Sequence, residues 1–321
     1  MALGQSRSSL LKYLLPESIP LTVKHFNKKP GKMKSCSLSL PTPDNKLIYR
    51  GRLAPSPTGF LHLGHAKTFY TAYQRALEHN GTLLYRNEDL DFQRCKEEFI
   101  QAAEEDLHWL GIHWQPPVLS QSKRLPLYRQ YLEQLKSKAA IYPCTCSRKE
   151  IALAATAPHD ENSEPIYPGF CRKRKLESIP HNQRFVWRFR VPDGEAIHFT
   201  DGRLGKQTYI AGKDFGDFII WRHDDIPSYQ LAVVVDDALT GINEVVRGED
   251  LLLSTARQLL LYRALGLTPP NFYHTPLLRD SAGHRLAKRS DSLSLRTLRS
   301  QGFSPEDVLK MVFSPNNPSS G

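Results

Sequence analysis

Apolar and polar positions follow one another in a regular order between residues 47 and 86. Residues 47–53 are short and mostly apolar, which predicts a strand, and a turn rich in Pro, Ser and Gly follows. Apolar residues then recur with helical period over residues 65–77, until an Asn-Gly pair at 80–81 ends the helix. Residues 82–86 are again strand-like. This order predicts a βαβ unit, whose turn offers unpaired amides and a helix dipole to an anion such as phosphate.

The pattern changes after Val191 and predicts a second group of elements. Two short strands separated by the turn pair Asp201-Gly202 predict a hairpin over residues 196–210. Strand-like apolar runs follow, and then two helices, the first of which Gly266 ends. The runs cover residues 218–222, 231–235 and 245–246, and the helices cover 252–265 and 305–312. Periodicity alone therefore predicts a generic α/β fold.

Two histidines stand at the predicted strand-to-helix turn. His62 and His65 flank Leu63 and Gly64, and such a pair can donate hydrogen bonds to charge that develops on a phosphoryl group. Gly64 would let a ligand approach the backbone closely. The alternative is that both histidines only cap or pack an ordinary helix, because short motifs often arise by chance.

The residues around these histidines resemble a known family. RLAPSPTGFLHLGH and the later RNEDLD (residues 86–91) resemble the signature of class I aminoacyl-tRNA synthetases of the glutamyl/glutaminyl type, with HLGH in place of their HIGH motif. RLAKRSD (residues 285–291) resembles their second, KMSKS-type motif. Lys288 matches its second lysine, whereas Arg285 and Ala287 replace the first lysine and the serine. The resemblance implies that Lys288 neutralises the departing pyrophosphate. Without the resemblance, the neighbouring cations Lys288 and Arg289 would indicate only a solvated surface patch.

The same resemblance implies a fold and a division of the chain. The fold is α/β, a Rossmann-like class I catalytic domain with an inserted, zinc-bearing subdomain of the acceptor type. We expect a basic, disordered leader (1–46), two halves of the catalytic domain (47–141 and 213–270), the inserted subdomain (142–212), a region with the KMSKS-like loop and a last helix (271–313), and a loose tail (314–321).

Glutamate recognition would need arginines for two carboxylates and an acid for the ammonium. Positions that match the family's glutamate site are Arg52, Ser56, Glu88, Tyr229 and Arg247, together with the segment Leu53, Ala54 and Pro55. Taken singly, the arginines could end strands in solvent, Glu88 could pair with Arg86, and Tyr229 could fill the core. Asp236 and Asp237 follow an apolar run at a predicted strand end. They could order ATP or a metal, but a structural role is the more usual one for such residues.

Three of the five cysteines cluster in the sequence. Cys144, Cys146 and Cys171 supply three thiolates, and an odd, clustered count favours metal binding over disulfides. The resemblance to a short glutamyl-synthetase-like subgroup implies Tyr167 as the fourth ligand of a structural Zn²⁺ ion, one per chain. The alternative is three reduced cysteines without a shared ligand.

The net charge and the hydropathy of the chain indicate whether it could bind a polyanion or cross a membrane. The net charge of +10 and the pI near 9.3 suit a polyanionic partner such as tRNA. No apolar run of about 18 residues occurs, so we predict no membrane span. The leader has no long apolar core of the kind a secretory signal needs, so we expect a cytoplasmic protein. Its Lys- and Ser-rich composition leaves organellar targeting open. Translation could also begin at Met33.

The short stretch after Lys288 leaves no room for an anticodon-binding domain. The sequence therefore resembles the glutamyl-Q tRNA(Asp) synthetases, compact paralogues that activate L-glutamate with ATP and Mg²⁺ and attach it to queuosine in tRNA(Asp). This resemblance covers about residues 48–313 and implies ATP binding by His62, Gly64, His65 and Lys288. We expect a monomer. The alternatives are a truncated glutamyl- or glutaminyl-tRNA synthetase that charges a 3′ end, a non-catalytic tRNA-binding paralogue, and a nucleotidyltransferase acting on a small molecule.

Overall fold

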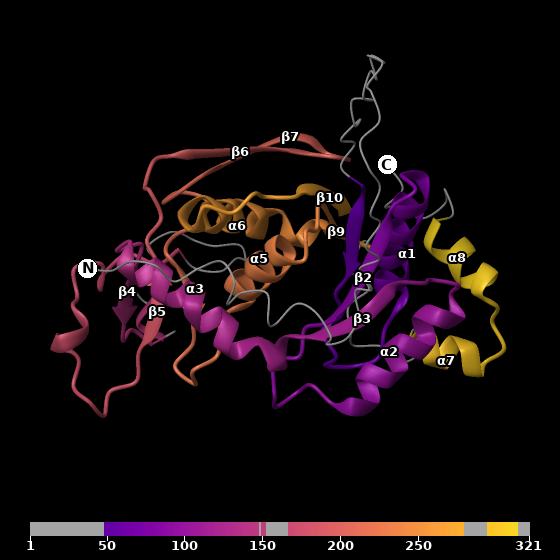
Figure 1. Cartoon of the computed structure of the whole chain (residues 1–321), viewed down its shortest axis with the longest axis horizontal. Helices are drawn as coiled ribbons and strands as arrows, with labels where there is room; N and C mark the ends of the chain where they lie inside the picture. Colours follow the sequence, from indigo (N-terminus) through magenta and orange to yellow (C-terminus); the bar gives the residue numbers. More distant parts are fainter. Residues whose placement is uncertain (1–47, 148, 152–165, 279–293, 314–321) are drawn as a thin grey trace, which may run out of the picture. The chain divides into compact units, whose positions relative to one another are not determined.

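The computed structural model describes residues 48–147, 149–151, 166–278 and 294–313 (Figure 1). The predicted leader, the loop that carries Lys288 and the predicted tail lie outside these residues. None of the described helices is long and apolar enough to cross a membrane.

A three-stranded parallel sheet holds the first predicted unit. Strand β1 (Arg50–Leu53) pairs with β2 (Thr82–Asn87), and β2 pairs with β3 (Gln115–Ser120). Helix α1 (Leu63–Glu78) connects β1 to β2, and α2 (Glu97–Trp109) connects β2 to β3. The predicted βαβ unit is thus confirmed, because the apolar stripe of α1 supplies core residues such as Ala66, Phe69 and Ala72.

A four-stranded sheet has the order β7-β6-β10-β9. The predicted hairpin is present as β6 (Ala196–Asp201) and β7 (Gly205–Ile210), which are antiparallel. Strand β10 (Asn271–Thr275) runs parallel to both β9 (Glu244–Gly248) and β6. Helix α6 (Leu252–Leu265) connects β9 to β10 and ends at Gly266, whose φ of 70° is left-handed, as predicted.

The three-stranded and the four-stranded sheet meet where β1 lies beside β9. The backbone N–H of Asn243 donates to the carbonyl of Arg50 (3.0 Å), and the guanidinium of Arg52 donates to the carbonyl of Val246 (3.0 Å). The connections leave this junction in opposite directions, to β2 on one side and β10 on the other. Such a switch point leaves a crevice at the carboxyl ends of the strands, which is where ligands bind in open α/β sheets.

A third, antiparallel sheet contains β4 (Ile141–Cys144), β5 (Val186–Phe189) and β8 (Phe218–Trp221). Helix α3 (Leu125–Ser137) precedes β4, and its buried residues join the core cluster that includes Phe189 and Phe218. Helices α7 (Leu295–Ser300) and α8 (Pro305–Phe313) are the last described elements, and residues 305–312 were predicted to be helical.

One predicted element is wrong. The apolar run 231–235 belongs to a helix, α5 (Tyr229–Leu239), and not to a strand, so Asp236 and Asp237 do not follow a strand end. All five residues of the run are buried, with at most 1% of each exposed. A helix buried on most sides loses the amphipathic period that would distinguish it from a buried strand.

Candidate functional site

A cavity of about 640 Å³ lies at the junction of the three-stranded and the four-stranded sheet. Its wall includes residues at the carboxyl ends of β1, β2, β9 and β10 and the first turn of α1. Ten residues that the sequence singled out line it: Arg52, Ala54, Pro55, Ser56, His62, Gly64, His65, Glu88, Tyr229 and Arg247. Leu53 is fully buried in the core and does not line it, and Lys288 lies outside the described residues.

The two histidines form the N-terminal cap of α1. The Nδ1 atom of His62 accepts from the backbone N–H of Gly64 (3.1 Å), and Nδ1 of His65 accepts from the backbone N–H of His62 (3.2 Å). In a neutral imidazole the proton is then on Nε2, which makes that nitrogen a donor. The capping function that was an alternative to phosphate binding is therefore present, and it fixes the tautomer that phosphate binding would need.

Gly64 is required by the packing of His62. A Cβ atom at this position would lie 2.9 Å from Cε1 of His62 and 3.1 Å from its Nδ1. The two imidazole rings are themselves close, with 3.9 Å between their centroids. Any larger residue at position 64 would displace the His62 ring from the wall of the cavity.

Arg247 places a buried cation in the cavity without an acid beside it. Only 5% of the residue is exposed, and its guanidinium donates to Gln258 Oε1 (2.8 Å), Thr255 Oγ1 (2.6 Å) and His274 Nε2 (3.2 Å), with Tyr229 Oη at 3.4 Å. Within residues 48–278 and 294–313, as far as they are described, Arg247 forms no ion pair. A buried charge is costly unless it is paired, so this site favours an anionic ligand.

Arg52, by contrast, has an acid within the protein. Its Nε lies 3.6 Å from Oδ1 of Asp237, which also accepts from Arg86 at 2.5 Å. Arg86 is completely buried and shares Asp237 with Arg52. Asp236, the neighbour on α5, accepts from Arg124, Gln121 and Tyr128. Both aspartates thus neutralise buried arginines, in line with the structural role favoured for them.

Glu88 is a carboxylate that lines the same cavity as Arg52 and Arg247. Its Oε1 accepts from Arg86 (2.9 Å), the pairing that the sequence left open as an alternative. Burial raises the pKa of Glu88, and the adjacent Arg86 opposes that rise. A carboxylate can accept several hydrogen bonds, so Glu88 can still receive an ammonium group from a ligand.

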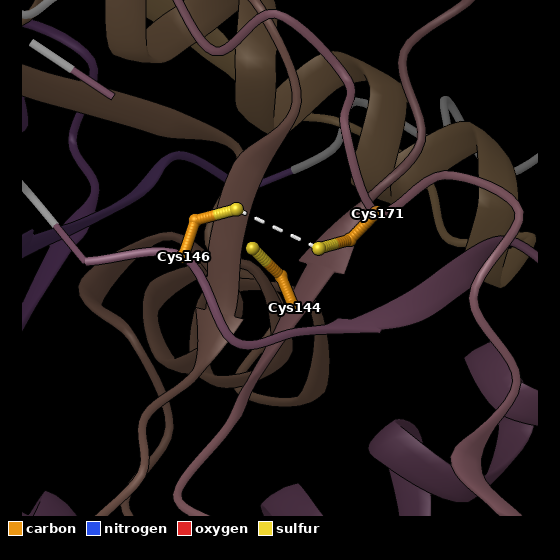
Figure 2. Close-up of side chains that lie close together, drawn as sticks. All are labelled: Cys144, Cys146 and Cys171. Carbon is orange, nitrogen blue, oxygen red and sulfur yellow. Dashed lines mark hydrogen bonds between the residues drawn. The ribbon is translucent and has the colours of Figure 1, made fainter. Parts of the chain in front are cut away.

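The cysteines converge as the sequence suggested. The thiol groups of Cys144, Cys146 and Cys171 point toward one another (Figure 2), and their sulfur atoms lie within 4.8 Å of one another. The Cys146 and Cys171 sulfurs are 3.6 Å apart, and all three cysteines are free. The Tyr167 hydroxyl lies 3.3 Å from the Cys144 sulfur and 3.5 Å from that of Cys146.

The distance between the Cys146 and Cys171 sulfurs, and the two distances from the Tyr167 hydroxyl to sulfur, fit the edges of a tetrahedral metal site. Ligands at Zn–S and Zn–O distances of about 2.3 and 2.0 Å are separated by roughly 3.8 Å for two sulfurs and 3.5 Å for sulfur and oxygen. Burial raises the pKa of Cys146 to about 11. At Cys171 burial also favours the neutral thiol, but hydrogen bonds from Tyr167, the Thr145 backbone and Cys146, together with the charge of Arg174, outweigh it and lower the pKa to about 7. One ligand is thus prepared to bind as a thiolate, and a metal would deprotonate the others.

Two site residues, His274 and Asp250, were not predicted from the sequence. His274 lies on β10, fully buried, between Arg247 and Asp201, and a lone histidine in an apolar strand has no distinguishing pattern. Asp250 lines the cavity and follows Arg247 in the motif VVRGED. Position 248 has room only for glycine beside this carboxylate, because a Cβ atom there would lie 2.5 Å from Asp250 Oδ1.

Comparison with known families identifies the class of protein. Residues 49–314 match the catalytic domain of the class I tRNA synthetases for glutamate and glutamine (E and Q). The chain belongs to this family.

Two curated relatives that match this chain over most of their own length are compact members of the family. The glutamyl-Q tRNA(Asp) synthetase of Rhodopirellula baltica is 43% identical over 274 residues, which cover 81% of this chain and 82% of the relative. That of Nitratidesulfovibrio vulgaris is 44% identical over 273 residues, with 81% and 84% covered. The glutamate–tRNA ligase of Hydrogenobaculum sp. is 39% identical over 269 residues, but these cover only 58% of its length and 83% of this chain.

A solved structure is similar to this fold. It is a glutamate tRNA ligase from Elizabethkingia meningosepticum in complex with its amino acid, with a TM-score of 0.69 and 27% identity. The likeness covers 85% of this chain and 62% of that structure. The chain therefore spans about three fifths of that ligase and most of the length of the glutamyl-Q tRNA(Asp) synthetases.

Proposed function

We propose that this chain activates L-glutamate with ATP and transfers it to queuosine in the anticodon of tRNA(Asp). The main support for glutamate activation is the environment of Arg247. This buried cation lines the cavity and has no acid partner among the described residues. The second half rests on the relatives named glutamyl-Q tRNA(Asp) synthetase, which match this chain over most of their own length.

The cavity offers complementary groups for glutamate. Arg247 would bind one carboxylate of glutamate in a bidentate contact, and Arg52 would lie near the other carboxylate. Glu88 would receive the ammonium, and the hydroxyls of Ser56 and Tyr229 would orient the substrate. Ala54 and Pro55 would form the adjoining wall, and Leu53 would contribute only through its backbone because its side chain is in the core.

Adenylation would take place beside the first turn of α1. A carboxylate oxygen of glutamate attacks the α-phosphorus of ATP, the bond from that phosphorus to the bridging oxygen breaks, and pyrophosphate leaves. His62, His65 and the amide of Gly64 would bind phosphate oxygens. Lys288 would neutralise the negative charge of the departing pyrophosphate. Mg²⁺ would accompany ATP, since the polyphosphate itself supplies oxygen ligands.

Transfer completes the proposed reaction. A hydroxyl of queuosine attacks the acyl carbon of glutamyl-adenylate, an ester bond forms, and AMP leaves with the mixed anhydride bond broken. Zn²⁺ at Cys144, Cys146, Tyr167 and Cys171 would have a structural role, because four protein ligands leave no open position for substrate. We further propose that the protein acts as a monomer and in the cytoplasm.

The test is ATP–pyrophosphate exchange across the twenty amino acids with no tRNA present. We expect exchange with glutamate and background rates with the others, including glutamine and aspartate. Exchange that requires tRNA, or that prefers another amino acid, would contradict the proposal. The 39% identity to a glutamate–tRNA ligase supports a second candidate, charging of a tRNA 3′ end, which differs in the acceptor and not in the amino acid.

A further inference from the structure

A second cavity, of about 850 Å³, adjoins the proposed glutamate site. Ser56, Glu88 and Tyr229 line both cavities, so the two share a wall. Arg188, Arg222 and His223 also line the second cavity, and the last two follow β8. An acceptor that occupied the second cavity would therefore lie beside both Glu88 and Arg222.

These two residues also line a third hollow of about 370 Å³, which we call the α3–β5 groove. Its wall is made by α3, by the segment that leads into β5, and by the end of β8. Trp187 of β5 and Trp221 of β8 are direct cross-strand partners, which places both side chains on the same face of the sheet. The second cavity thus shares lining residues with both the glutamate site and the groove.

Aromatic rings form the floor of the α3–β5 groove. Phe185 meets Trp187 edge to face, with 5.6 Å between ring centroids, and both side chains are half-buried. The Lys136 ammonium lies 4.7 Å from the centre of the Trp187 ring. Half-buried aromatic rings beside a cation are the type of surface on which unpaired bases stack.

The charge of the groove favours a polyanion. Arg129, Lys136, Arg184 and Arg222 line it, together with His223, against two acids, Glu133 and Asp225. Lys136 pairs with Glu133, Arg129 pairs with Asp225, and Arg222 pairs with Asp224. Arg184 is exposed and makes no ion pair with any residue in the described ranges, so its charge is available to a partner.

We propose that the α3–β5 groove binds unpaired nucleotides of the acceptor RNA that flank the nucleotide receiving glutamate. This inference rests on the proposed function and adds the surface that holds the RNA. Bases would stack on Phe185 and Trp187, and phosphates would contact Arg184 and Arg222. Unpaired loop nucleotides suit such a surface because their bases are accessible for stacking, unlike those of a duplex.

The test measures tRNA binding and glutamate activation separately in two variants. Arg184→Glu reverses an exposed charge, and Phe185→Leu removes a stacking ring while keeping an apolar side chain. We expect each to raise the Kd for queuosine-containing tRNA(Asp) by about 10-fold. Arg184→Glu should also flatten the dependence of log Kd on log salt by roughly 0.7 or more, because contacts to single-stranded phosphates are lost. ATP–pyrophosphate exchange without tRNA should stay within 2-fold of the parent.

Lys310→Glu on α8 is the matched charge-reversal control, because Lys310 is exposed and does not line the groove. Parent-like tRNA affinity and salt dependence in both groove variants, with exchange intact, would overturn the inference. A loss of binding in Lys310→Glu as large as in Arg184→Glu would overturn it too, since the effect would then be general electrostatics. Absence of glutamate-dependent exchange in the parent would instead refute the proposed function.

Discussion

Arg247 donates from Nε to Nε2 of His274 across 3.2 Å, although both side chains could carry positive charge. The contact requires a neutral imidazole, with its proton on Nδ1 facing the Asp201 carboxylate at 2.6 Å. Burial, together with the charge of Arg247, lowers the pKa of His274 to about 4. The neutral His274 thus orients Arg247 while leaving its charge uncompensated for a ligand.

Arg247→Gln should weaken glutamate binding without disturbing ATP. Hydrogen bonds to a charged group contribute about 1.5–3 kcal/mol, so we expect the KM for glutamate in pyrophosphate exchange to rise about 10- to 150-fold. Arg263→Gln is the control, because Arg263 lies on α6, is exposed and pairs with Glu195. An unchanged glutamate KM in Arg247→Gln would remove this residue from the site.

His274 should make stability depend on pH. Its pKa is lower in the folded protein than in the unfolded chain, so the unfolded state binds the proton first as pH falls. The contribution is complete above about pH 6.5 and is lost as pH falls toward 4, by up to about 3 kcal/mol. Compared with His274→Gln, the parent should therefore lose more of its free energy of unfolding between pH 7 and 4 in denaturant titrations.

Asp106 acts in the opposite sense over part of this range. Burial raises its pKa to about 6, so its protonated form stabilises the folded state at low pH. Only the difference between parent and variant isolates His274, because Asp106 is present in both. Parallel pH profiles for the two proteins would show that His274 is not held neutral.

Gly64→Ala should lower the adenylation rate while the protein still folds. The new Cβ atom would displace the His62 ring, and misplacement by about 1 Å can reduce a rate on the order of 100-fold. Displacing His62 also weakens the cap of α1, at a cost of about 1 kcal/mol that the better helix propensity of alanine partly offsets. Gly59→Ala is the control, since nothing lies within 4 Å of a Cβ atom there. Equal rates of pyrophosphate exchange in parent and Gly64→Ala would contradict the role of His62.

Much of the fold could be predicted from local pattern, and the contacts within the site could not. Helix α1 and the β6–β7 hairpin follow from periodicity and from the turn residues that end them. Helix α5 was missed because it is buried on most sides. Contacts such as Arg247 with His274 join segments 27 residues apart, and no single-sequence pattern encodes such a pairing. The domain boundaries remain a prediction.

Metal content tests the cysteine cluster. We expect about one zinc ion per chain in the parent, and a marked loss in Cys144→Ser with a lower Tm, because a structural metal stabilises only the folded state. Cys95→Ser is the matched control, since Cys95 is free and lies outside the cluster. Elemental analysis after dialysis provides the measurement. A parent protein that is folded and free of metal would rule out the zinc site.

Locating the transferred glutamate tests the central claim most directly. Radiolabelled glutamate and ATP are incubated with the protein and tRNA(Asp), with or without queuosine, and the labelled RNA is cut with nuclease. We expect label only in queuosine-containing tRNA(Asp), in the fragment with the anticodon. Label at the 3′-terminal adenosine of tRNA(Glu), or equal labelling of tRNA(Asp) without queuosine, would contradict transfer to queuosine.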